Sequence, residues 1–224
     1  MTAAYLGIDP QTKRFPAWML LDPERRMIDS GWLSGGNFRE ITHEAVELTQ
    51  RIQHEGIDRL LIGIDAPRQH RPTIREYYWD RKKTTWRPRK PSEVGYGRHC
   101  EVVVKAAKLA NPQWTPVAGN CPEWMELGFS LFEALVKTGA SVHEVFPSAS
   151  YSMLEGERHP PVSIDFSAFR PGKTDMIDAC IAAYTMIEFD QGRGCEVGDD
   201  GLGTIVLPRA LSERIPVELL QYPG

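Results

Sequence analysis

The sequence predicts a mixed α/β fold in which antiparallel strands are followed by parallel ones. Three strand-like segments lie close together near the N-terminus, and a segment with helical spacing follows them. An uninterrupted apolar run at residues 60–65 is then typical of a central strand buried on both faces. With 224 residues, 42% of them hydrophobic, we expect one substantial core and a single domain spanning residues 1–224.

The first third of the chain is expected to form an antiparallel meander and a helix. Strands are predicted at Ala3–Asp9, Phe15–Leu21 and Arg26–Leu33, because short connections favour antiparallel pairing. Apolar residues recur every three or four positions over Phe38–Glu55, which predicts a helix. The strand Leu60–Asp65 follows it.

The rest of the chain is expected to contain an irregular insertion, three helices and two further strands. Prolines and charged residues break the pattern over residues 66–97, and residues 148–172 and the C-terminal residues are predicted to be loop and peripheral. Thr174 is the predicted N-cap of the last helix. The expected helices are Arg98–Ala110, Glu123–Lys137 and Asp175–Phe189, and the expected strands are Ser141–Phe146 and Thr204–Leu207.

Composition points to the cytoplasm. None of the four cysteines forms a C-x-x-C pair, and free thiols are typical of a reducing compartment. A strand is predicted at the very N-terminus, which leaves no room for a signal peptide. No apolar run approaches the ~20 residues of a membrane span, so we expect no membrane contact.

Carboxylates stand at the ends of several predicted elements. Asp9 and Asp65 end strands, Glu144 lies within one, and Asp175 and Asp178 lie three residues apart at the start of a helix. Because carboxylates repel one another, their convergence requires a cation. Oxygen ligands suit Mg²⁺ or Mn²⁺, which act on phosphates. The sequence therefore predicts a metal-dependent phosphodiesterase.

Each acid also has a purely structural interpretation. Asp9 before Pro10 is a common turn starter, and Asp65 could simply close its strand. Glu144 shares a strand face with apolar neighbours, so it needs a partner, either an arginine or lysine or a metal. Asp175 and Asp178 in a first helical turn favourably oppose the helix dipole.

A basic, aromatic segment follows Asp65. Residues 66–92 hold nine Lys and Arg against two Asp and Glu, a charge of +7, so the remaining chain carries −11 of the total of −4. Cations bind phosphates and aromatic rings stack on bases, which predicts nucleic-acid contacts at the rim of the site. Alternatively, the segment is a solvated excursion whose rings fold back on the body. The predicted contacts are Trp79, Arg81, Lys82, Lys83, Trp86, Arg87 and Arg98.

The chain resembles an uncharacterised family named "domain of unknown function 429", which is expected to adopt an RNase H-like fold. The match rests on the order of six short pieces that together cover most of the chain. They are Gly7-Ile8-Asp9, Ile64-Asp65-Ala66-Pro67, Arg98-His99-Cys100-Glu101, Glu144-Val145-Phe146-Pro147, Lys173 through Ala179, and Gly201 through Pro208. The chain departs from the family at Pro10 and in the long basic segment.

The resemblance implies an RNase H-like mixed sheet in the order 3-2-1-4-5, with three antiparallel strands, then parallel strands, and helices on both faces. It implies a two-metal site formed by Asp9, Asp65, and Asp175 or Asp178. Glu144 and Glu101 correspond to further acids of the family. Arg98, Glu101 and Lys105 also share one helical face, as in an ordinary salt-bridge ladder.

We therefore expect a metal-dependent nuclease that uses Mg²⁺ or Mn²⁺ and acts on DNA or RNA. One alternative is a non-catalytic nucleic-acid-binding module with the same fold. Another is a phosphotransferase with an actin-like fold. Such an enzyme requires a glycine-rich phosphate loop after its first strand, and Asp9-Pro10-Gln11-Thr12-Lys13 lacks the glycines. No G-x-x-x-x-G-K-[ST] and no G-x-G-x-x-G after a strand occurs, so no nucleotide or organic cofactor is expected.

Overall fold

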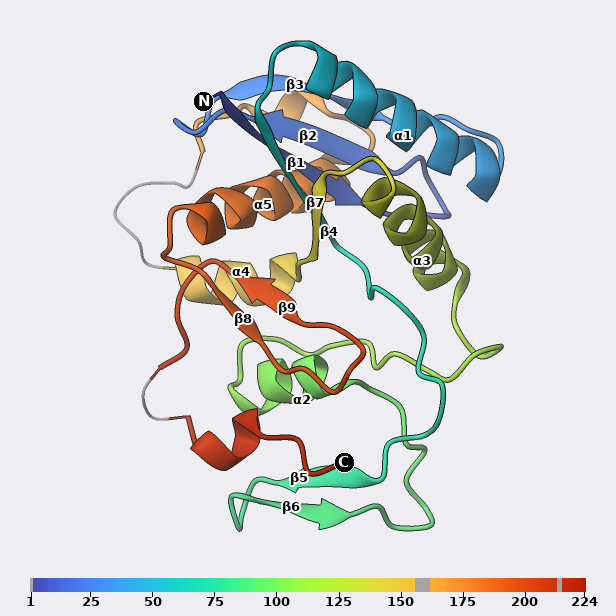
Figure 1. Ribbon diagram of the computed structural model, residues 1–224, viewed down its shortest axis with the longest axis vertical. Coiled ribbons are helices and arrows are strands. Elements are labelled where there is room, and N and C mark those ends of the chain that lie inside the picture. Colours follow the sequence, from blue (N-terminus) through green and yellow to red (C-terminus); the bar gives the residue numbers. More distant parts are fainter. Residues whose placement is uncertain (1, 156–161, 213–214) are drawn as a thin grey trace.

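A mixed five-stranded sheet organises the upper half of the molecule (Figure 1). The computed structural model describes residues 2–155, 162–212 and 215–224. The sheet order is β3-β2-β1-β4-β7, with β1, β2 and β3 antiparallel and β4 and β7 parallel to β1. The predicted mixed sheet is confirmed. Its fifth strand is labelled β7, because the two strands of a separate hairpin come before it along the chain. The strands are β1 Ala3–Asp9, β2 Ala17–Leu21, β3 Met27–Trp32, β4 Arg59–Ile64 and β7 Ser141–Glu144.

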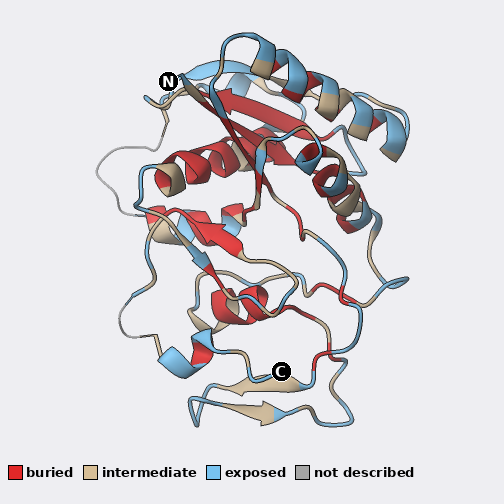
Figure 2. Ribbon diagram, viewed as in Figure 1, coloured by how far each residue is buried: buried red, intermediate tan, exposed pale blue. Residues whose placement is uncertain are grey.

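Helices cover both faces of this sheet. Helices α1, Phe38–His54, and α3, Glu123–Val136, pack on one face, and α5, Lys173–Asp190, packs on the other. Figure 2 shows the buried positions concentrated in the central strands and in α5. Side chains of a strand alternate between faces, so each face has its own hydrophobic cluster.

Helix α5 lies directly on the backbone of the two central strands. A Cβ atom added to Gly7 of β1 would stand 1.9 Å from the Ala179 carbonyl oxygen and 2.5 Å from the Ala183 nitrogen. A Cβ on Gly63 of β4 would stand 2.9 Å from the Ala182 carbonyl oxygen. Glycine in the strands and alanine on the helix therefore permit this close approach.

The lower half of the molecule has a hydrophobic core of its own (Figure 1). It is built around α2, with a β-hairpin inside the 66–97 insertion, a second hairpin after α5, and a C-terminal 3-10 turn. Helix α4 lies between this core and α5. These elements are α2 His99–Ala106, α4 Pro147–Leu154, β5 Tyr77–Asp80, β6 Thr85–Pro88, β8 Cys195–Val197, β9 Ile205–Leu207 and η2 Val217–Leu220; a further turn, η1, spans Phe166–Ala168.

Several local predictions were wrong. The segment after β7 is helix α4 rather than loop, because Pro147 has a φ suited to a first helical position. Thr174 lies inside α5, whose N-cap is Gly172 at φ 117°. The C-terminal residues are not peripheral, because Leu219 is only 1% exposed in the lower core. Helix α2 ends at Ala106, four residues earlier than expected.

No helix among the described residues is long and apolar enough to cross a membrane.

Replacing Gly7 with alanine should destabilise the protein by at least about 3 kcal/mol, because the new methyl group overlaps the backbone of α5. Gly36→Ala is the matched control, since its added carbon would meet only the end of the Glu40 side chain, at 3.3 Å. Urea unfolding of both variants measures the difference. Equal midpoints would mean that α5 does not rest on β1 in this way.

Candidate functional site

Asp9 and Asp65 stand side by side at the ends of the two central strands. Strands β1 and β4 are parallel and pair Ile8 with Ile64, so the following aspartates leave the sheet together. The Asp65 amide donates to the Ile8 carbonyl at 2.9 Å, which extends the pairing by one residue. Both aspartates line a cavity of about 360 Å³. The predicted convergence of these two residues is present in the structure.

Helix α5 brings Asp178 toward these acids. Burial, followed by the neighbouring Asp178, raises the pKa of Asp9 to about 8. Burial, followed by Asp9 and Asp178, also holds the pKa of Asp65 well above its usual range. The pKa of Asp178 is itself raised to about 6 by burial and by Asp175. The three carboxylates therefore destabilise one another's charged forms.

Asp175, the other acid of this helical face, is held by an arginine. Arg14 donates from Nε to Oδ2 at 2.6 Å and from Nη2 to Oδ1 at 2.7 Å. This bidentate pair neutralises Asp175 and anchors the loop after β1 to the start of α5. The sequence left Asp175 and Asp178 as equal candidates. The arrangement favours Asp178 as the member that faces Asp9 and Asp65.

Among residues 2–155, 162–212 and 215–224, the side chains that donate to the three clustered acids are neutral. The Gln11 side-chain nitrogen lies 3.3 Å from Asp9 Oδ2, and the Tyr151 hydroxyl hydrogen-bonds Asp178. In the described part of the chain, the Asp65 carboxylate has no hydrogen-bond donor. Sequence reasoning missed Tyr151, because it lies on α4, where a loop was expected.

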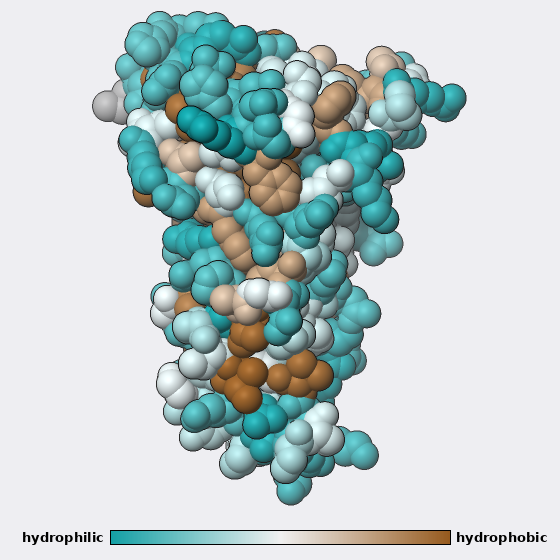
Figure 3. All heavy atoms as spheres, turned by 90° about the vertical axis from the view of Figure 1, so that its right-hand side faces the viewer, coloured by the Kyte–Doolittle hydropathy of each residue, from teal (hydrophilic) through white to brown (hydrophobic). Residues whose placement is uncertain are grey.

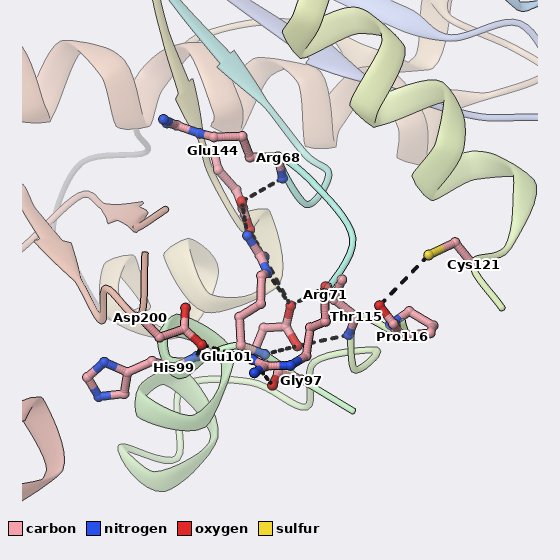
Figure 4. Close-up of polar contacts among 11 residues, drawn as sticks. Arg68, Arg71, Gly97, His99, Glu101, Thr115, Pro116, Cys121, Glu144 and Asp200 are labelled. Carbon is pink, nitrogen blue, oxygen red and sulfur yellow. Dashed lines mark hydrogen bonds and ion pairs between the residues drawn. The ribbon is translucent and has the colours of Figure 1, made fainter. Parts of the chain in front are cut away.

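Glu144 is neutralised by a buried arginine. Arg98 donates to Glu144 Oε2 from Nη1 at 2.7 Å and to Oε1 from Nη2, and the Arg68 amide donates to Oε2 at 2.9 Å (Figure 4). The Arg98 and Glu144 side chains are 1% and 4% exposed. Of the two partners considered for Glu144, the structure provides the arginine. Glu144 lines the cavity with its carboxylate bound to Arg98.

Glu101 binds the same guanidinium from the other side. It accepts from Arg98 Nε at 3.0 Å and from the Thr115 amide at 3.0 Å, and also from the Thr115 hydroxyl (Figure 4). We call the three residues Glu101, Arg98 and Glu144 the ion triad. The expected Arg98–Glu101 pair is therefore present, and it is buried rather than part of an exposed ladder. The triad joins the end of β7 to the start of α2.

The clustered acids are compatible with a hard divalent cation but do not form a complete cage. Within residues 2–155, 162–212 and 215–224, no group of three His, Cys, Asp or Glu side chains is arranged to hold a metal ion. Mg²⁺ is usually bound by one or two protein carboxylates together with water and substrate phosphates, so a three-ligand cage is not required. Within the part of the chain that the structure describes, Asp65 has no donor and Asp9 has one long hydrogen bond from Gln11, so both have oxygens available for such an ion. The donor set fits the expected metal.

The basic segment makes internal contacts that the sequence did not reveal. Trp79 and Trp86 pack edge to face at 5.4 Å, and the Trp86 indole donates to the Glu218 carbonyl at 2.7 Å. Arg87 pairs with Glu93, and Arg81 donates to the Lys105 carbonyl. Lys82 and Lys83 remain exposed.

The surface of this side is also mixed in character. Figure 3, which faces the side of the molecule at the right of Figure 1, shows an apolar cluster in the lower half among hydrophilic atoms. The packed Trp79 and Trp86 rings favour the alternative in which the aromatic residues fold back on the body. Arg98 is buried in the ion triad, so its guanidinium is not available at the surface.

Asp9→Asn should stabilise the protein in metal-free buffer by about 1–3 kcal/mol, because it removes a buried charge repelled by its neighbours. The folded-state pKa of Asp9, about 8, lies above its unfolded value, so ionisation opposes folding increasingly as pH rises toward 8. The gain should therefore be larger near pH 8 than near pH 5.

Melting temperatures at both pH values test this expectation. Asp175→Asn is the matched control: it removes the same charge but breaks the Arg14 pair, and should not stabilise. Identical behaviour of the two variants would contradict the assignment of Asp178 rather than Asp175 to the acid cluster.

Arg98→Met should destabilise the protein by about 3–5 kcal/mol, because Glu101 and Glu144 would remain buried without their cation. Adding Glu144→Gln to this variant should restore part of the loss. Arg39→Met on the exposed face of α1 is the control and should be near neutral. Denaturant unfolding gives all three values; a loss no greater than that of Arg39→Met would mean that the ion triad does not hold the two halves together.

Comparison of the chain with protein-family models, curated proteins and solved structures found no match.

Proposed function

We propose that this protein is a metal-dependent nuclease with an RNase H-like fold, hydrolysing phosphodiester bonds of nucleic acid with Mg²⁺ or Mn²⁺. The observation that carries the proposal is the cluster of Asp9, Asp65 and Asp178, of which Asp9 and Asp65 line one cavity and Asp178 lies close enough to raise the pKa of both. Among the described residues, the side chains that donate to these acids are neutral. Such a cluster is unfavourable in the absence of a cation. The sheet order, with acids at the ends of β1 and β4, supports the same fold assignment.

The side chains around the cavity divide into two roles. Asp9 and Asp65 would hold the ion, and Asp178, which is hydrogen-bonded by the Tyr151 hydroxyl, would add negative charge beside them. The ion triad would hold Glu144 in the wall of the cavity through its hydrogen bonds to Arg98. A bound ion would supply Lewis-acid stabilisation of the phosphoryl oxygens and lower the pKa of an attacking water.

The loop after β1 favours hydrolysis of a phosphate ester over transfer of a phosphate group from a nucleotide. The loop after β1, Pro10 to Pro16, contains no glycine, so its backbone does not form the glycine-rich cradle that holds nucleotide phosphates. A non-catalytic nucleic-acid-binding module would not require Asp9 and Asp65 to lie side by side. We therefore retain the nuclease as the proposed function.

Asp65→Asn should reduce Mn²⁺-dependent cleavage by at least about 100-fold, since even partners of metal ligands contribute 10–100-fold. Single-stranded, duplex and branched DNA and RNA should be tested as substrates. Asp29→Asn, an exposed acid of β3, removes the same charge and should leave cleavage unchanged.

Manganese should also raise the melting temperature of the parent protein but not that of Asp65→Asn. Equal cleavage by Asp65→Asn and parent would reject the site. A parent that shows neither cleavage nor a manganese-dependent thermal shift would reject the proposed function.

A further inference from the structure

A second hollow adjoins the acid cavity on the other side of the loop after β1. Its volume is about 680 Å³, and it is lined by the loop Gln11 to Phe15, by Trp32 and Phe38, and by Arg170 beside η1. Gln11 lines both this hollow and the acid cavity. We call the hollow the basic groove.

The charge of the basic groove is opposite to that of the chain as a whole. Lys13, Arg14 and Arg170 line it together with a single acid, Glu123, whereas the chain carries a net charge of −4. Lys13 and Arg170 are exposed, and in the described part of the chain neither has an ion-pair partner. Unpaired cations in a groove of an acidic protein would attract an anionic ligand.

Aromatic rings accompany these cations. Phe15 is 52% exposed, and Trp32 and Phe38 are half-buried in the wall of the groove. Single-stranded nucleic acids are recognised by this combination, in which cations follow the backbone and rings stack on unpaired bases. A small phosphate ester would use the cations but would not require an exposed phenylalanine beside them.

The basic groove leads to the acids. Lys13 is four residues beyond Asp9, so their Cα atoms lie within about 14 Å of each other even along a fully extended chain. Arg14 contacts Asp175, which lies one helical turn before Asp178. A strand lying in the groove would therefore present a nearby phosphate to the acid cavity.

We propose that the basic groove binds a single-stranded nucleic acid next to the bond to be cleaved, with phosphates on Lys13 and Arg170 and a base on Phe15. This inference rests on the proposed function and specifies its substrate as an unpaired strand. The proposal places nucleic-acid binding at the loop that follows Asp9, and not at the β5–β6 hairpin, whose aromatic rings pack against each other.

The test is the binding of a fluorescent oligothymidine or oligouridine in EDTA, where cleavage does not occur, over a range of salt concentrations. Replacing both Lys13 and Arg170 with alanine should weaken binding and reduce the slope of log affinity against log salt by about 1.4, for two lost phosphate contacts. Lys82→Ala with Lys83→Ala is the matched control, because it removes two exposed cations from the hairpin. It should leave the slope unchanged.

Phe15→Ala should lower the affinity roughly tenfold with little change in slope, as expected for lost base stacking. The exposed positions of Lys13, Phe15 and Arg170 allow these changes without unfolding, which melting temperatures verify. A duplex of the same sequence should bind more weakly than the single strand.

The inference is overturned if the hairpin pair reduces the slope and the groove pair does not, or if the parent binds duplex as well as single strand. It is also overturned if the parent binds neither. Failure of the proposed function is distinguishable: binding in EDTA would be retained and would depend on the groove, but manganese would produce neither cleavage nor a thermal shift.

Discussion

The absence of a side chain at Gly7 is the constraint from which the site follows. It allows the backbone of α5 to rest on β1, with the Ala179 carbonyl at the place where a Cβ atom would stand. Asp9 lies two residues after Gly7, and Asp178 lies immediately before Ala179. The separation of these two carboxylates is therefore determined by backbone packing rather than by flexible side chains, which is how a site is held in a fixed geometry.

The second determinant is electrostatic. The ion triad places one guanidinium between two carboxylates, so Glu144 and Glu101 share a cation within the protein. Among the described residues, Asp9, Asp65 and Asp178 are not bound by a guanidinium in this way, and each raises the pKa of a neighbour in the cluster or has its own pKa raised by one. The two groups of acids therefore have different roles. Glu101 and Glu144 join the halves of the molecule through Arg98, and the aspartates retain unfavourable charge of the kind that functional sites tolerate.

The sequence was informative where a repeating pattern specifies an element. Period and length predicted the strands and the three main helices, and the position of two aspartates at strand ends predicted the meeting of Asp9 and Asp65. The sheet order was predicted only from the resemblance to the family. The sequence could not decide between Asp175 and Asp178, because residues three apart share a helical face. The sequence did not indicate Tyr151 as a site residue, because Ser148 to Ser152 shows no apolar periodicity from which helix α4 could be predicted. Arg98 and Glu144 lie 46 residues apart, so only the tertiary structure could pair them.

The internal contacts of the cations in the basic segment determine how strongly the stability of the lower half depends on salt concentration. Arg71 pairs with Asp200 at side-chain exposures of 8% and 2%, and Arg75 lies over the ring of Tyr78 at 3.8 Å. Dissolved ions screen charges across water over about 8 Å at physiological ionic strength, but they act much less on buried pairs. The stability of this half should therefore be far less sensitive to ionic strength than its composition suggests, and the electric potential outside it smaller than a formal charge of +7 implies.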